Sequence, residues 1–400
     1  MGAKRIGIVG GGIVGLATAY KLTQRMPGAS ITVFEKESAP GRHQSTHNSG
    51  VLHCGLAYKP GSAKARLAVS GLRQMLAFCQ ENNVPHDQCG KLVVATNEAE
   101  VALMNNLFDR GTANGLRGLR KLDAKEILEY EPHARGVAAI HVPEEGIADY
   151  AKVIEALAGK IKGSGNKIFT GWNVSQIERK NGEWRVRSDA GEEACDLIVT
   201  TAGLYADRVS ALAGEPRETR IVPFRGEYYK LRKESEYLVR NLIYPVPNPR
   251  FPFLGVHFTR LARGGIEAGP NAVLAFAREG YAKMTFNARD IADYLTFSGL
   301  WRFAGRHLGV CVHEIRQSFS KKLFVKALQK LVPEIREEDL EQGGAGVRAQ
   351  AMRPDGTLVE DFQFIRRPGA LHVVNAPSPA ATASLAIADE VVNQIEAINN

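Results

Sequence analysis

The first part of the chain has the hydrophobic pattern of a strand, an amphipathic helix and a second strand. Residues Arg5–Val9 form a short apolar run, and apolar residues recur at helical spacing from Ile13 to about Arg25. A turn at Pro27-Gly28 follows, and Ile31–Phe34 is the next apolar run. Short apolar runs that flank a helical pattern favour a parallel β-α-β unit. The chain is therefore predicted to open with an α/β element.

Helical and strand-like patterns alternate through the rest of the chain. Segment Ser62–Glu81 carries one apolar stripe and has Ser62 as a candidate N-cap. Val174–Ile177 and Trp184–Val186 alternate, and Asn181-Gly182 between them is typical of a hairpin turn. The other expected elements are strands at Lys91–Thr96, Leu197–Thr201 and Leu371–Val374, helices at Tyr150–Lys162, from Ala292 to Leu331 and up to about Ile395, and a glycine-rich loop around Gly343, Gly344 and Gly346.

Composition and charge restrict the possible functions. The chain is 44% hydrophobic and 24% charged, which is typical of a globular protein. The five cysteines show neither CxxC pairing nor metal-ligand spacing, so we expect no metal site. An odd number of scattered thiols also indicates a reduced, intracellular protein. The first apolar run is too short for a signal peptide or a membrane span, so we expect a cytoplasmic protein. The net charge of +8 suits an anionic substrate, an anionic membrane surface or simple solubility, and no motif indicates nucleic acid.

A glycine motif lies between the first strand and the first helix. Gly10-Gly11-Gly12-Ile13-Val14-Gly15 has the GxGxxG form, in which the glycines permit a tight turn, close approach of a pyrophosphate and close helix–strand packing. The amide groups and dipole of a helix N-terminus favour phosphate there. Glu35 ends the second strand, where a carboxylate accepts hydrogen bonds from ribose. Together these features predict a dinucleotide site.

Three later segments favour FAD over NAD as the dinucleotide. The loop 42–50 offers many hydrogen-bond donors soon after Glu35, and the strand that ends at Ala202-Gly203 gives a second close approach of backbone to cofactor. The small-residue turn 376–383 opens the last helix, whose N-terminus stabilises negative charge on a reduced flavin.

Several longer motifs carry a family resemblance. They are NSGVLHCG at 48–55, IVPFRGEYY at 221–229, YPVP at 244–247, HFTR at 257–260, GPNA at 269–272, GVRAQ at 346–350 and NAPSPAAT at 375–382. The chain resembles the D-amino-acid oxidase / glycerol-3-phosphate dehydrogenase superfamily of flavoproteins and, more narrowly, the L-2-hydroxyglutarate dehydrogenase (oxidase) family, over nearly its whole length. The resemblance implies oxidation of L-2-hydroxyglutarate to 2-oxoglutarate, with electrons passed to a quinone or dioxygen. Cys54 departs from the small residue, such as Ala or Ser, expected at that position.

These observations predict an α/β fold with a discontinuous, Rossmann-like FAD-binding domain and a mixed α+β substrate domain. We expect residues 1–84, 149–215 and 340–400 in the first and residues 85–148 and 216–339 in the second. The residues expected to contact FAD are Gly10, Gly12, Ile13, Val14, Gly15, Glu35, Lys36, Arg42, Ser45, Thr46, Asn48, Ser49, Gly50, Val174, Ala202, Gly203, Ser378, Ala380, Ala381 and Thr382.

His53 is the candidate catalytic base. Oxidation of a 2-hydroxy acid needs a group that takes the hydroxyl proton, and imidazole titrates near the working pH. His53 lies in a glycine-flanked loop that enters the cofactor region. A structural role and covalent flavin attachment remain alternatives, and His257 is the competing base.

Arg348 is the candidate ligand of a substrate carboxylate. A guanidinium offers a planar fork that matches a carboxylate. Arg225 and Arg260 are candidates for a second carboxylate, or else solvated strand arginines. Tyr228, Asn271 and His257 are further substrate-binding candidates, and Tyr229 must point to the opposite face of the strand from Tyr228.

Segment Asp293–Ile315 is a candidate membrane-surface helix, with packing on the substrate domain as the alternative. Its bulky residues are Tyr294, Phe297, Leu300, Trp301, Phe303 and Leu308, with Arg302, Arg306 and Arg316 among or beside them. Two other functions remain open: an amino-acid or amine oxidase of the same fold, and a nucleotide-binding protein without chemistry.

Overall fold

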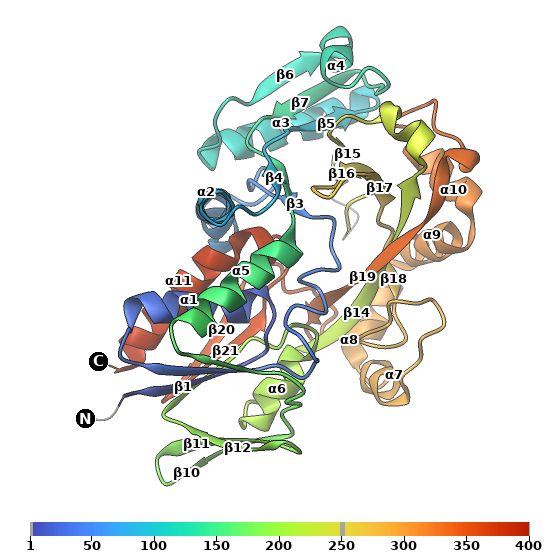
Figure 1. Cartoon of the computed structure of the whole chain (residues 1–400). Helices are drawn as coiled ribbons and strands as arrows, with labels where there is room; N and C mark the ends of the chain where they lie inside the picture. Colours follow the sequence, from blue (N-terminus) through green and yellow to red (C-terminus); the bar gives the residue numbers. More distant parts are fainter. Residues whose placement is uncertain (1–2, 249–252, 400) are drawn as a thin grey trace.

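The computed structural model describes residues 3–248 and 253–399, and two large sheets organise them (Figure 1). The first sheet has six strands in the order β20-β21-β13-β1-β2-β9. Strands β1, β2, β9, β13 and β21 run parallel, and β20 is antiparallel at the edge. The strands are β1 (Arg5–Val9), β2 (Ser30–Phe34), β9 (Lys167–Phe169), β13 (Leu197–Thr200), β20 (Gln363–Arg367) and β21 (Ala370–Asn375).

Four helices lie together on one side of the six-stranded sheet (Figure 1). They are α1 (Ile13–Arg25), α2 (Ala63–Glu81), α5 (Tyr150–Gly163) and α11 (Ala380–Asn399). Helix α1 begins and ends where the hydrophobic pattern predicts, and the Ser62 side chain caps α2 by accepting a hydrogen bond from Ala65 N. Helix α11 continues past the predicted end near Ile395.

A small antiparallel sheet, β10-β11-β12, lies on the other side (Figure 1). The predicted hairpin turn is confirmed, because Asn181 and Gly182 have φ values of 53° and 85° between β10 and β11. The bounds are β10 (Gln176–Lys180), β11 (Glu183–Ser188) and β12 (Gly191–Cys195), and β13 is followed by the short helices η1 (Gly203–Tyr205) and α6 (Ala206–Leu212).

The second large sheet has nine strands in the order β18-β14-β17-β16-β15-β5-β7-β6, with β19 paired to β14. Helix α10 packs on it through Phe324, Val325 and Leu328. Its strands are β5 (Lys91–Ala95), β6 (Arg120–Asp123), β7 (Ala138–Val142), β14 (Arg220–Leu231), β15 (Leu242–Pro245), β16 (His257–Arg260), β17 (Ile266–Gly269), β18 (Val273–Leu274) and β19 (Leu340–Met352).

The glycine-rich loop predicted around Gly343–Gly346 is wrong, because these residues lie within strand β19. Glycine permits close contact here: a Cβ on Gly343 would lie 2.6 Å from the Tyr228 carbonyl oxygen, and one on Gly346 would lie 2.4 Å from the His47 carbonyl oxygen. Because β19 belongs to the nine-stranded sheet, residues 340–352 pair with the predicted substrate domain, although the predicted division assigns them to the FAD-binding domain.

The helical stretch predicted from Ala292 to Leu331 consists of four helices. They are α7 (Ala288–Leu295), α8 (Ser298–Arg306), α9 (Leu308–Phe319) and α10 (Lys321–Leu328). Tyr294, Phe297, Leu300 and Phe303 are buried in a core with Val222 and Phe224, so most of the bulky residues of the predicted membrane helix pack inward. Trp301 and Leu308 are exposed.

The remaining elements are three strands, which form the small sheet β3-β8-β4, two α-helices and two 3-10 helices. They are β3 (Val51–Leu52), β4 (His86–Asp87), β8 (Gly146–Ala148), α3 (Glu98–Ala113), α4 (Ala124–Tyr130), η2 (Lys233–Leu238) and η3 (Glu337–Asp339). None of the helices in the described ranges is long and apolar enough to cross a bilayer.

Candidate active site

A cavity of about 1250 Å³ is lined by residues of both large sheets. Its wall contains the glycine loop after β1, the carboxyl ends of β2 and β13, the loop 41–49 and the start of α11. It also contains residues of β5, β14, β15, β16 and β19 from the nine-stranded sheet. Its volume exceeds the ~300–1000 Å³ that is typical of a small-molecule pocket, and its position beyond the carboxyl ends of parallel strands is usual for a nucleotide.

The glycine loop has the geometry that a dinucleotide needs. Gly10 has φ +112°, and a Cβ there would lie 2.6 Å from the Thr201 carbonyl oxygen. A Cβ on Gly15 would lie 2.0 Å from the Gly10 carbonyl oxygen, so Gly15 shapes the loop without lining the cavity. Gly12, Ile13 and Val14 do line it, at the N-terminus of α1. The amides of this first turn favour phosphate oxygens.

Glu35 is buried beside this loop. One carboxylate oxygen accepts a hydrogen bond from Gly11 N at 2.8 Å, and the other accepts one from Glu37 N at 2.9 Å. Each oxygen retains a lone pair, so the carboxylate is oriented and still able to accept ribose hydroxyls.

The loop after β2 divides into residues that line the cavity and residues that shape the loop. Arg42, Ser45, Asn48 and Ser49 line the cavity, and the Ser45 hydroxyl also accepts a hydrogen bond from Ile13 N at 2.9 Å. Thr46 and Gly50, which are predicted cofactor residues, do not: the Thr46 hydroxyl donates to Gly41 O at 2.6 Å, and Gly50 N donates to Asn48 Oδ1 at 2.9 Å.

Residues from three distant parts of the chain complete the lining. Val174, Ala202 and Gly203 lie there, as do Ser378, Ala380, Ala381 and Thr382 at the start of α11. The Thr382 hydroxyl accepts a hydrogen bond from His53 N at 3.1 Å and contacts the Tyr150 hydroxyl at 3.0 Å. The last helix therefore fixes the loop that carries His53.

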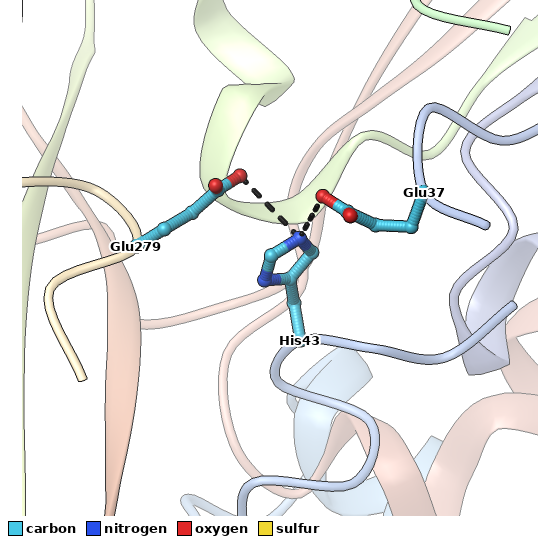
Figure 2. Close-up of side chains that lie close together, drawn as sticks. All are labelled: Glu37, His43 and Glu279. Carbon is cyan, nitrogen blue, oxygen red and sulfur yellow. Dashed lines mark hydrogen bonds and ion pairs between the residues drawn. The ribbon is translucent and has the colours of Figure 1, made fainter. Parts of the chain in front are cut away.

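A charged cluster joins the loop after β2 to the segment that follows β18 (Figure 2). His43 Nε2 lies 2.9 Å from Glu37 Oε1 and 3.4 Å from Glu279 Oε1. Three potential metal ligands meet here, but the Lys36 ammonium pairs with Glu37 and lies 2.5 Å from Glu279 Oε1. The chain's own ammonium thus pairs with both carboxylates, and Lys36, a predicted cofactor residue, also lines the cavity.

His53 lies in the cavity next to a buried carboxylate. Its Nδ1 is 3.4 Å from Glu145 Oε2, and the Glu145 side chain is 2% exposed. Glu145 Oε1 lies 2.7 Å from Lys91 Nζ. Burial raises the pKa of Glu145, but the Lys91 and His53 charges lower it further, so that its net pKa lies below the usual range. Glu145 is therefore ionised near neutral pH.

His257 also lines the cavity but is held neutral. Its Nδ1 donates to Gly255 O at 2.8 Å, since a carbonyl oxygen only accepts, and its ring stacks on Tyr244 with centroids 3.8 Å apart. Burial is the main cause that lowers the pKa of His257, to about 3. A base this weak is poorly matched to neutral pH, and a neutral ring offers no cation to a carboxylate.

Arg348 lines the same part of the cavity from β19. Within the described chain no carboxylate pairs with it, and its guanidinium lies 5.6 Å from the Phe253 ring centroid. Arg225, Arg260 and Asn271 lie outside the cavity lining. Arg225 pairs with Glu227 at 2.9 Å, Arg260 pairs with Asp87, and Asn271 Nδ2 donates to Glu227 Oε2 at 2.9 Å.

One buried tyrosine, Tyr244, and two half-buried tyrosines, Tyr58 and Tyr228, surround this end of the cavity. Tyr58, Tyr228 and Tyr244 line it, and burial raises the pKa of Tyr228 to about 12 and those of the other two still higher. All three therefore keep their hydroxyl protons near neutral pH. Tyr229 points away from the cavity and packs on Phe324, with ring centroids 4.8 Å apart, as the alternation of side chains along a strand requires.

The chain was compared with known proteins. A family model described as FAD-dependent oxidoreductase matches residues 5–394. The chain belongs to this family. L-2-hydroxyglutarate dehydrogenase of Indibacter alkaliphilus is 49% identical over 96% of each chain, and the mitochondrial L-2-hydroxyglutarate dehydrogenase of Homo sapiens is 45% identical over 97% of this chain and 88% of its own. Dithionite-reduced L-α-glycerophosphate oxidase from Mycoplasma pneumoniae, with FAD bound, has a similar fold with a TM-score of 0.80, 23% identity, and coverage of 99% of this chain and 95% of its own.

This FAD-dependent oxidoreductase has a cavity that fits its cofactor. The N-terminus of α1 and Glu35 suit a diphosphate and a ribose, and the cavity continues from them to His53 and the start of α11. The α/β fold and the FAD cofactor predicted from the sequence are confirmed.

The sequence reasoning missed Lys91, Glu145, Tyr58 and Tyr244. Lys91 is the first residue of an apolar strand, and Glu145 lies in the turn Pro143-Glu144-Glu145-Gly146. Charged residues at such positions are usually exposed to solvent, so the sequence does not mark either residue as part of a buried site. One signal was available for Tyr244, because it is the first residue of a motif that carried the family resemblance.

Proposed function

We propose that this FAD-dependent oxidoreductase converts L-2-hydroxyglutarate to 2-oxoglutarate. The proposal rests on relatives of that name that are 45–49% identical over at least 96% of the chain. The cavity supports it, because an arginine without an ion pair in the described chain lines the same cavity as an imidazole. These groups suit an anionic substrate that must lose a hydroxyl proton.

In this proposal each residue has a separate task. Arg348 binds a carboxylate of the substrate, and His53 takes the hydroxyl proton. The O–H and C–H bonds at carbon 2 break, a C=O bond forms, and the proton goes to the imidazole. Bound FAD would supply the acceptor for the hydride, with a quinone or dioxygen as the final acceptor of the two electrons. Tyr58, Tyr228 and Tyr244 shield the reacting carbon from water.

The proposed FAD contacts come from the cavity-lining members of the predicted set. The first-turn amides of α1 would bind the diphosphate, Glu35 would accept hydrogen bonds from the ribose hydroxyls, and the N-terminus of α11 would stabilise negative charge on the reduced flavin. Gly15, Thr46 and Gly50 contribute by shaping the loops.

Anaerobic mixing with each enantiomer of 2-hydroxyglutarate tests the function. We expect the L enantiomer to bleach the flavin absorbance and to yield 2-oxoglutarate, and the D enantiomer to leave the flavin oxidised. L-glutamate is the matched control, because it replaces only the hydroxyl by an amine. Bleaching by glutamate alone would identify an amino-acid oxidase and overturn the proposal. Re-oxidation by a soluble quinone or by air then identifies the acceptor.

We further propose that helices α8 and α9 bind the surface of an anionic membrane, at the inner face of the cytoplasmic membrane. Nine of the thirteen most exposed large hydrophobic side chains in the described chain lie between residues 276 and 319. Trp301 is 60% exposed, Leu308 62% and Phe319 78%. Arg302, Arg306 and Arg316 are exposed on the same two helices, while Glu314 accepts a hydrogen bond from Ala272 N. Apolar side chains flanked by arginines suit anionic lipid headgroups, where a membrane quinone is accessible.

Co-sedimentation with phosphatidylglycerol vesicles tests this surface. We expect binding at low salt, weaker binding at high salt, and little binding to phosphatidylcholine vesicles. The double variant Trp301→Ser/Phe319→Ser should bind less, whereas Tyr237→Ser, which alters a 65% exposed ring elsewhere, should bind as the wild type does. Absence of binding to phosphatidylglycerol at low salt would contradict the proposal.

A further inference from the structure

A buried carboxylate forms part of the cavity wall. Glu145 is in the turn between β7 and β8, and its side chain is 2% exposed. Oε1 accepts hydrogen bonds from Lys91 Nζ at 2.7 Å, from Cys54 Sγ at 3.2 Å and from Cys54 N at 3.3 Å. A buried carboxylate is stable only with such partners.

The second oxygen of Glu145 is directed at His53. Within the described residues Oε2 accepts no hydrogen bond, and His53 Nδ1 faces it at 3.4 Å. This distance is slightly longer than a hydrogen bond, so a small movement of the ring closes it. The ring itself is one-quarter exposed to the cavity, and its loop is fixed by the bond from His53 N to Thr382.

We propose that Glu145 is a positioning residue that fixes the orientation and tautomer of His53, and that Lys91 and Cys54 hold Glu145 in place for this task. The proposal rests on the proposed function, in which His53 is the base. With Nδ1–H donated to Oε2, the lone pair of His53 lies on Nε2, which takes the hydroxyl proton. The carboxylate also stabilises the imidazolium that forms, as in other carboxylate–histidine pairs.

The other neighbours do not replace Glu145. Burial raises the pKa of the Cys54 thiol, which stays protonated and donates its hydrogen. Tyr58, Tyr244 and His257 are neutral near pH 7. Among the residues that the structure describes, Glu145 is the carboxylate that lies within ion-pair distance of His53.

Glu145→Gln is a sharp test because Lys91 determines how the new amide is oriented. The ammonium requires the amide oxygen at the Oε1 position, and the NH₂ group then faces His53 Nδ1. Nδ1 must accept, so the proton moves to Nε2, the nitrogen that should be free. We expect kcat to fall by about 100-fold, within the range of general-base effects, with FAD content retained. We also expect the acidic limb of the kcat/KM profile to move to lower pH, because the imidazolium loses its counter-charge.

Three further variants complete the experiment. Glu144→Gln alters the neighbouring, half-buried glutamate and should leave kcat and the pH profile unchanged. Glu145→Asp should recover part of kcat. If Glu145→Gln fails to fold because Lys91 is left unpaired, Lys91→Met/Glu145→Gln removes both charges and should fold with the same low kcat. Wild-type kcat with an unchanged pH profile in a folded Glu145→Gln protein would overturn the proposal.

A measurement without substrate separates this proposal from the proposed function. Histidine ¹⁵N spectra of the FAD-loaded protein, assigned with His53→Gln, report which ring nitrogen carries the proton. We expect Nδ1–H in the wild type and Nε2–H in Glu145→Gln. If L-2-hydroxyglutarate does not bleach the flavin but the tautomer changes as expected, the function fails and the positioning role stands. If the tautomer does not change, the positioning role fails.

Discussion

Three arginines of the predicted substrate site differ in what surrounds them. Arg225 and Arg260 are each held by a carboxylate, whereas Arg348 faces the cavity and pairs with no carboxylate of the described chain. A guanidinium that is already paired gains little from a substrate carboxylate. The neighbours of each arginine, and not its residue type, therefore determine which one is available.

Arg348→Ala should raise KM for L-2-hydroxyglutarate and leave FAD content unchanged. A hydrogen bond to a charged group contributes ~1.5–3 kcal/mol, so we expect an increase of about 10- to 150-fold. Arg260→Ala is the matched control, since it removes a partly exposed ion pair outside the cavity, and its KM should stay close to that of the wild type. Steady-state kinetics of both variants measure the difference, and an unchanged KM in Arg348→Ala would argue against carboxylate binding.

At the scale of elements, an ion cluster joins helix α6 to helix α7. Asp293 of α7 lies 2.7 Å from Arg217 and 3.0 Å from Arg278, and Asp207 of α6 lies 2.5 Å from Arg278. Burial raises the pKa of Asp293 and of Asp207, but the arginines lower each further, so both carboxylates titrate below their usual value of 3.8. The cluster connects a helix beside the six-stranded sheet to one beside the nine-stranded sheet.

The cluster should make the free energy of unfolding depend on pH in the acidic range. A carboxylate whose pKa is lower in the folded state stabilises fully above its unfolded pKa, and the contribution is lost as the pH falls below about 4. We expect Asp293→Asn to lower the free energy of unfolding by ~1–3 kcal/mol at neutral pH, and to lose less stability than the wild type on acidification. Asp189→Asn, at an exposed aspartate, is the control. Urea midpoints at several pH values test this, and parallel curves for Asp293→Asn and the wild type would contradict it.

Elements with strong local signals could be predicted, and those that depend on distant partners could not. The hydrophobic pattern and Ser62 fix α1, β1 and α2 within a residue or two, because spacing and capping act locally. In the sequence alone, the glycines of β19 suggest a loop. In the structure they permit close contact with β14 and with the His47 backbone. The burial of Lys91 and Glu145 could not be predicted for the same reason, because it depends on strands that are far apart in the chain.

At the scale of the whole molecule, residues 10, 12–14, 201–203 and 376–382 line one cavity. A cofactor in it should therefore stabilise both ends of the chain together. We expect excess FAD to raise the Tm of cofactor-free protein, with a gain of about 2.7 kcal/mol at a concentration of 100 Kd. NAD is the control and should not raise it. Differential scanning calorimetry measures both, and an FAD-independent Tm would contradict the proposed site.

The position of β21 has a consequence for how the protein is made. Strand β13 pairs with β1 on one side and β21 on the other, and Thr382, just after β21, bonds to the His53 backbone. A nascent chain that still lacks residues 370–382 has an open edge on β13 and an unfinished wall around its flavin site. Secure capture of flavin must therefore wait until these residues have left the ribosome, so that the vitamin-derived group is added only after residue 382 has been synthesised.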